Sequence, residues 1–122
     1  MRLALLLLAL SASPAAAARV EIGALSAAGP AVKCLDESGL QLVTTDSPQW
    51  LVLRQGRNAW RAALVDGCPR VGRNRIIARR NTQGRLCFND LVEVIDPVGG
   101  MNLGQCRIGR IEPVSIPKGA RF

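Results

Sequence analysis

The sequence contains no histidine and no tyrosine, and only two tryptophans and two phenylalanines. The lack of histidine excludes mechanisms with an imidazole base and metal sites with imidazole ligands. With so few aromatic rings there is little surface for stacking bases, so nucleic acid is a poor candidate partner. Glycine-rich phosphate-binding loops and the G-x-S-x-G nucleophile motif are also missing. We therefore expect neither a cofactor nor a metal.

Long apolar runs are confined to the N-terminus. A positively charged start, Met1-Arg2, is followed by the apolar run Leu3–Leu10 and by the small-residue segment Ser11–Ala18. This three-part layout is typical of a secretory signal peptide, and we expect cleavage between Ala18 and Arg19. The apolar run is far shorter than the roughly 20 residues that span a bilayer. The sequence thus predicts an exported protein, periplasmic or secreted.

Four cysteines are spaced C-x33-C-x18-C-x18-C. Zinc sites and thioredoxin-like redox sites need closely paired cysteines, which are missing here. An even number of cysteines in a small exported chain is typical of structural disulfides, so we predict two. Spacing leaves three pairings open. We favour Cys34–Cys106 with Cys68–Cys87, because the first bond ties the first strand to the last and the second closes a local loop.

The 104 residues after the leader are enough for one domain. Residues 19–30 are rich in small side chains and are expected to form a flexible, loosely held N-terminal arm before a single domain at residues 31–122. Short runs with β-branched residues predict strands at residues 31–35, 40–45, 50–55, 58–65, 75–80, 91–96 and 105–114. The three glycines of Pro97–Gly104 predict a flexible loop.

The segment Asn58–Val65 is compatible with two structures. Asn58 could cap a helix that ends at Gly67, but apolar residues also alternate along the segment, and Gly56 stands where a hairpin would turn. We favour the strand. Short strands at this spacing predict an all-β fold, a small barrel or sandwich of five to seven antiparallel strands. Trp50, Trp60 and Phe88 are expected to anchor its core rather than to bind a ligand.

The cysteines and their neighbours resemble a known family. Cys34 comes first, Cys68-Pro69 follows the turn residues Gln55-Gly56-Arg57, Gly84–Cys87 is followed by Asp90, and Gly104–Gly109 leads into Pro113-Val114. This ordered set resembles a domain-of-unknown-function family of small exported bacterial proteins. Arg107 and Ile111 depart from its pattern, which often has an apolar residue and an aromatic tail there. The resemblance implies export and a compact disulfide-bonded domain, and no activity.

The charge of the chain is uneven. After removal of the leader, 15 basic residues stand against nine acidic ones. Nine arginines face a single acid, Asp66, between residues 54 and 85, and they are Arg54, Arg57, Arg61, Arg70, Arg73, Arg75, Arg79, Arg80 and Arg85. Such a patch attracts anions, and arginine grips phosphate and carboxylate with two donors. The alternative, which the composition favours, is a solvated surface that keeps a small protein soluble.

These features predict a non-catalytic envelope accessory or anion-binding module. Its partner would be a phospholipid head group, a lipopolysaccharide phosphate or an acidic polymer. One alternative is an inhibitor of another exported protein that acts through the loop Pro97–Gly104. Another is a hydrolase that uses Asp90 with a neighbouring carboxylate, Glu93 or Asp96. Asp90 is more simply explained as a turn residue whose carboxylate accepts backbone hydrogen bonds.

Overall fold

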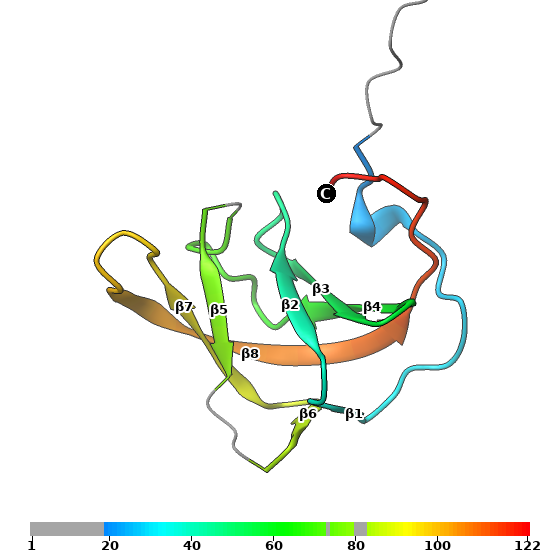
Figure 1. The fold of residues 1–122 in the computed structure, drawn as a ribbon, viewed down its shortest axis with the longest axis horizontal. Helices are drawn as coiled ribbons and strands as arrows, with labels where there is room; N and C mark the ends of the chain where they lie inside the picture. Colours follow the sequence, from blue (N-terminus) through cyan, green and yellow to red (C-terminus); the bar gives the residue numbers. More distant parts are fainter. Residues whose placement is uncertain (1–18, 73, 80–82) are drawn as a thin grey trace, which may run out of the picture.

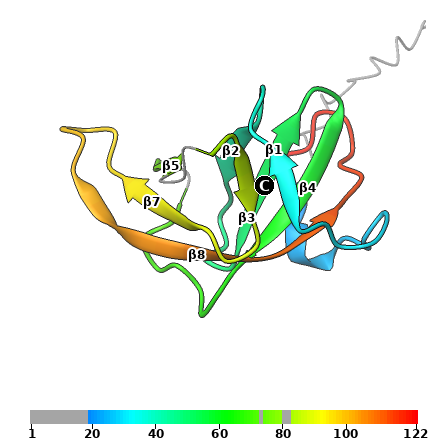
Figure 2. The same cartoon turned by 90° about the horizontal axis from the view of Figure 1, so that it is seen from below.

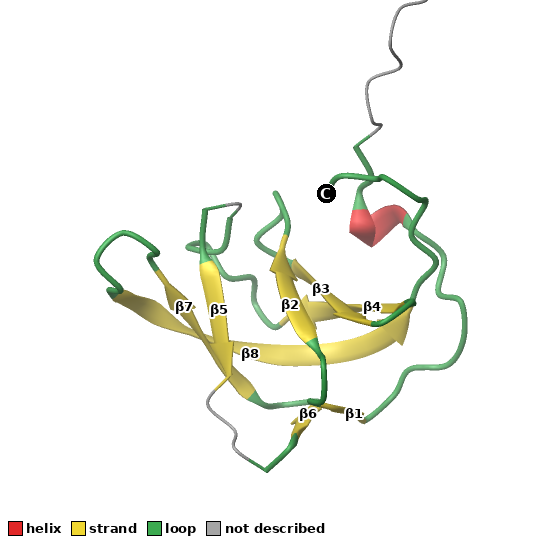
Figure 3. Cartoon of the chain, in the orientation of Figure 1, coloured by secondary structure: helices red, strands yellow, loops and turns green. Residues whose placement is uncertain are grey.

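The chain folds into short strands joined by turns, and the prediction of an all-β fold is confirmed (Figure 3). The computed structural model describes residues 19–72, 74–79 and 83–122, so the predicted leader, residues 1–18, lies outside the described part. The described elements in chain order are η1 (Ile22–Ala24), β1 (Cys34–Asp36), β2 (Gln41–Thr44), β3 (Trp50–Gln55), β4 (Asn58–Leu64), β5 (Ile76–Arg79), β6 (Arg85–Cys87), β7 (Leu91–Ile95) and β8 (Asn102–Pro113).

Six strands form one antiparallel sheet that is nearly closed into a barrel. Their order is β2-β3-β4-β8-β7-β5, and the edge strands β2 and β5 lie side by side (Figure 1). Arg79 of β5 donates from Nη1 to the carbonyl oxygen of Leu40, just before β2, at 3.5 Å. Near-closure protects strand edges that would otherwise pair with another chain. β1 and β6 form a separate two-stranded sheet.

Alternation along each strand places one face inside the barrel. Leu51 and Leu53 of β3 are fully buried, and they lie opposite Ala62 and Trp60 of β4. Since directly paired residues project to the same side of a sheet, Trp60 faces this interior and packs against the core, as predicted. Phe88 is 49% exposed and does not anchor the core, because it follows β6 in a turn at the surface.

The longest strand, β8, joins the two halves of the barrel. Residues 102–107 pair with β7, and residues 108–113 pair with β4. The register shifts once in each pairing, and such bulges bend a strand. Figure 2 shows β8 as a long curved strand along one side of the molecule. Its 12 residues separate the β7–β8 hairpin from the end of β8 by about 35 Å along the strand.

The four cysteines form two disulfides, but the favoured pairing is wrong. Cys34 is bonded to Cys87, and Cys68 is bonded to Cys106. Cys34 and Cys87 lie directly opposite each other in the β1–β6 ladder, which brings their Cα atoms to 4.0 Å. The second bond ties the turn after β4 to the middle of β8. The pairing of β1 with β6 determines which cysteines are bonded, and the spacing of the cysteines in the sequence contains no information about that strand pairing.

The strand ranges are close to those predicted, with two corrections. The barrel sheet has six strands, within the predicted five to seven, but β6 of the separate two-stranded sheet was not predicted, because three residues are too few to show alternation. β8 begins at Asn102 rather than at residue 105, since Asn102 and Gly104 pair with Ile95 and Val94 although their composition favours a loop. The segment after Asn58 is a strand. Among the described residues, no helix is long and apolar enough to cross a membrane.

Residues 19–30, expected to form a flexible arm, pack against the outside of β3 and β4. Ile22 in η1 is 3% exposed. The backbone N–H of Ala28 donates to the carbonyl oxygen of Pro113 at 2.8 Å, and that of Val20 donates to the carbonyl oxygen of Arg121 at 2.6 Å. These contacts make the segment part of the folded unit, and they place residues 20 and 121 side by side.

Candidate anion-binding site

The described arginines between residues 54 and 85 are spread over several elements of the fold. Arg73 and Arg80 lie outside the described residues. The other seven belong to different elements, namely the β3–β4 hairpin, the segment between β4 and β5, β5 itself and β6, and they are Arg54, Arg57, Arg61, Arg70, Arg75, Arg79 and Arg85. Each group therefore has its own surroundings and its own capacity to bind an anion.

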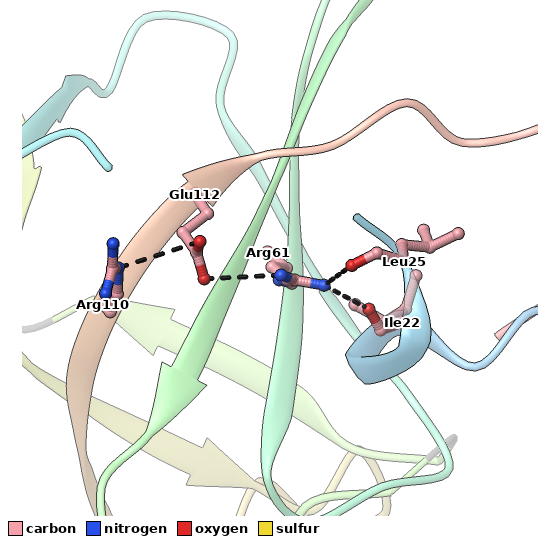
Figure 4. A network of polar contacts seen from close by, with 5 residues as sticks. All are labelled: Ile22, Leu25, Arg61, Arg110 and Glu112. Carbon is pink, nitrogen blue, oxygen red and sulfur yellow. Dashed lines mark hydrogen bonds and ion pairs between the residues drawn. The ribbon is translucent and has the colours of Figure 1, made fainter. Parts of the chain in front are cut away.

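Arg61 lies inside the fold and is only 8% exposed. Its Nη1 donates to the carbonyl oxygen of Ile22 at 3.0 Å and to that of Leu25, while Nη2 lies 3.5 Å from Glu112 Oε1 (Figure 4). Its guanidinium carbon lies 5.2 Å from the centre of the Trp50 ring, within range of a cation–π contact. Arg61 thus holds residues 22–25 against the barrel and is not a surface cation.

Other arginines lie close to carboxylates. Arg75 Nη1 is 3.7 Å from Asp96 Oδ2, and Arg79 Nε is 3.7 Å from Glu37 Oε1. Arg85 pairs with Asp36 in the β1–β6 ladder. A neighbouring carboxylate offsets part of the positive potential of each arginine. This reduces the attraction of β5 and β6 for a further anion.

The β3–β4 hairpin and the segment after β8 form a hollow of about 450 Å³. Arg54 from β3, Arg57 from the turn and Lys118 from the C-terminal segment line it together with the polar side chains of Asn58 and Ser115. Its lining, drawn from the described residues, contains three cations and no carboxylate. We call these five residues the basic hollow.

Local sequence explains this arrangement. Gly56, with a φ of 58°, makes the tight turn that places Arg57 at the tip of the hairpin. After β8, the backbone N–H of Val114 donates to the carbonyl oxygen of Ala59 at 3.0 Å, which keeps the chain beside the hairpin as the C-terminal segment begins. The centre of the Phe122 ring lies 5.2 Å from the guanidinium carbon of Arg54, so the C-terminal segment also contacts this cation.

The prediction of an arginine surface included Arg54 and Arg57 but missed Lys118. Lys118 lies near the end of the chain, outside the arginine-rich stretch of residues 54–85 on which the prediction rested. The available signal was Pro113, the last residue of β8, after which the chain runs past the β3–β4 hairpin. Guanidinium and ammonium groups without carboxylate neighbours suit phosphate, sulfate or carboxylate ligands. The side chains of the basic hollow are therefore chemically suited to an anionic ligand.

The acidic residues that could serve a hydrolase have structural contacts. Asp90 Oδ2 accepts a hydrogen bond from the backbone N–H of Cys87 at 2.7 Å, as predicted for a turn residue. Asp96 Oδ1 accepts one from Val98 at 2.9 Å. Within residues 19–72, 74–79 and 83–122, no group of three or more cysteine, aspartate or glutamate side chains is arranged to hold a metal ion.

Comparison with known proteins identifies no relative. No protein-family model matches the chain, and searches of curated proteins and of solved structures yield no significant match. The resemblance to a family of small exported proteins, the export itself and the absence of catalysis therefore stay predictions.

Proposed function

We propose that this protein is an exported, non-catalytic β-domain that binds an acidic polymer of the cell envelope through the basic hollow. The observation that carries the proposal is the gathering of Arg54, Arg57 and Lys118 around one hollow whose lining contains no carboxylate. Cations brought together by a folded hairpin and a returning segment can contact one anion without first ordering a flexible loop.

The size of the hollow supports a small anionic group as the part that is bound. About 450 Å³ lies within the range of known small-ligand pockets. It accommodates one phosphate or one sugar carboxylate, and the rest of a polymer would continue over the surface. Two arginines can each offer paired donors to such a group, and Lys118 adds a compact positive charge.

Calorimetric titration with a heparin oligosaccharide, a model polyanion, tests the proposal. The triple variant Arg54→Ser/Arg57→Ser/Lys118→Ser should bind at least about tenfold more weakly than the unchanged protein at low salt. A matched control, Lys33→Ser/Arg85→Ser/Arg107→Ser, removes the same charges from exposed positions outside the hollow. It should keep most of the affinity.

Salt dependence separates specific binding from general attraction. The affinity of the unchanged protein should fall as salt rises, and the hollow variant should show a shallower dependence because fewer ions are released on binding. Equal losses in the hollow variant and the matched control would show that net charge alone is responsible. Affinity that does not respond to salt would also refute the proposal.

A further inference from the structure

The β7–β8 hairpin lies at one end of the molecule along its longest axis (Figure 1). It carries large apolar side chains that are exposed to solvent. Val98 is 84% exposed and Met101 is 66% exposed. Ile76, which is 52% exposed, pairs with Ile95 at the base of the same hairpin. We call Ile76, Val98 and Met101 the apolar tip.

The turn that carries the apolar tip is held by its own hydrogen bonds. The backbone N–H of Asp96 donates to the carbonyl oxygen of Met101 at 2.8 Å, and the N–H of Gly100 donates to the carbonyl oxygen of Asp96 at 3.1 Å. Asp96 Oδ1 accepts from the N–H of Val98 at 2.9 Å. Val98 and Met101 are thus displayed in a defined geometry, which reduces the entropy that would be lost on docking.

Charges around the tip are arranged asymmetrically. Residues 97–101 contain no charged side chain. The carboxylate of Asp96, at the base of the hairpin, accepts a hydrogen bond within its own turn and lies 3.7 Å from Arg75 Nη1. Arg70 is exposed, and together with Arg75 and Leu103 it lines a shallow hollow at the base of the hairpin. The apolar end is therefore followed by an exposed cation, Arg70, and by Arg75, whose charge is partly offset by Asp96.

We propose that the β7–β8 hairpin docks on an anionic lipid bilayer, with the apolar tip among the head groups and Arg70 against lipid phosphates. This surface is distinct from the basic hollow, because β8 separates the two regions by its full length. The inference therefore does not rest on the proposed function.

A lipid surface fits this hairpin better than a protein does. Val98 and Met101 are both largely exposed, and a protein partner would need a surface of matching shape to bury them. A bilayer interface accepts apolar protrusions of any shape and attracts cations that lie at head-group depth. Since the hairpin contains neither tryptophan nor tyrosine, which anchor proteins at this interface, the association should be weak and reversible.

Co-sedimentation with vesicles of equal parts phosphatidylglycerol and phosphatidylethanolamine tests the inference, with phosphatidylcholine vesicles as the neutral comparison. Val98→Ser/Met101→Ser should lower the partition coefficient at least about tenfold. The matched control Val65→Ser/Phe88→Ser removes two similarly apolar side chains, 41% and 49% exposed, that lie outside the tip. It should bind as the unchanged protein does. All variants carry the same N-terminus, so any contribution of the N-terminus to vesicle binding is the same in each of them.

Charge variants complete the test. Arg70→Ser should weaken binding to anionic vesicles and leave binding to neutral vesicles unchanged, whereas Arg54→Ser/Arg57→Ser should retain vesicle binding. If the Val98→Ser/Met101→Ser protein binds as well as the unchanged protein, or if neither binds, the inference is wrong. If the hairpin instead docks on a protein, the unchanged protein should capture that partner and bind no vesicles, and the Val98→Ser/Met101→Ser variant should lose the capture.

Discussion

Replacing Arg61 with alanine should destabilise the fold more than removing any single described cation at the surface or in the basic hollow. Its side chain is 9% exposed, and it contacts two carbonyl oxygens of the N-terminal segment, Glu112 and the Trp50 ring. Removing one partner of a buried ion pair costs about 3–5 kcal/mol, because the remaining charge keeps its burial and loses its compensation.

The contacts of Glu112 narrow the expected loss in the free energy of unfolding of the Arg61→Ala variant. This carboxylate is 16% exposed, and it also lies 3.8 Å from Arg110 Nε, so it keeps one cation when Arg61 is lost. We therefore expect the lower end of the range, about 3 kcal/mol. For a domain of this size, that loss is a large fraction of the total free energy of unfolding.

Arg110→Ala is the matched control, since Arg110 contacts the same carboxylate from the surface with its side chain 69% exposed. Exposed ion pairs contribute little, so its effect should stay below about 1 kcal/mol. Urea unfolding followed by circular dichroism measures both variants. The midpoint for Arg61→Ala should fall by about 1–3 M. A shift below about 0.5 M, or equal shifts in the two variants, would refute the role assigned to burial.

Two further predictions concern the covalent and steric constraints of the fold. Replacing Cys34 and Cys87 with serine opens a loop with a sequence separation of 53 residues, which should lower the free energy of unfolding by about 4 kcal/mol; an unchanged urea midpoint would contradict this. Gly23→Ala should lower the melting temperature, because a Cβ there would lie 2.6 Å from the Trp50 indole nitrogen. Gly72→Ala, whose Cβ would have open space, should leave the melting temperature nearly unchanged, and equal effects of the two glycine variants would rule out the steric explanation.

The barrel strands could be predicted because their local patterns agree with the fold. Trp60, Ala62 and Leu64 alternate in sequence, and they face the same interior in β4. The turn at Gly56 was visible for a similar reason, since a positive φ there favours glycine. Strands and turns of this kind depend on residues that are close together in the sequence, so their patterns can be recognised there.

Contacts between segments that are far apart in the sequence could not be predicted in this way. Arg61 occupies an outward position of β4, so alternation predicted an exposed cation, yet η1 covers it. The basic hollow needs Lys118 beside the β3–β4 hairpin, and only the return of the chain after Pro113 brings it there. The disulfide pairing was mispredicted because the β1–β6 ladder joins segments with no shared local pattern.

The hydrogen bond between Val20 and Arg121 brings the two ends of the described chain together. A short linker could therefore join them, and new ends could be opened between Gly99 and Gly100, where both residues are exposed. In such a circular permutant β8 would become the first strand and β7 the last, with their pairing retained in the sheet. Its folding would show that the hairpin connection is dispensable for the barrel, which frees this loop to diverge in evolution.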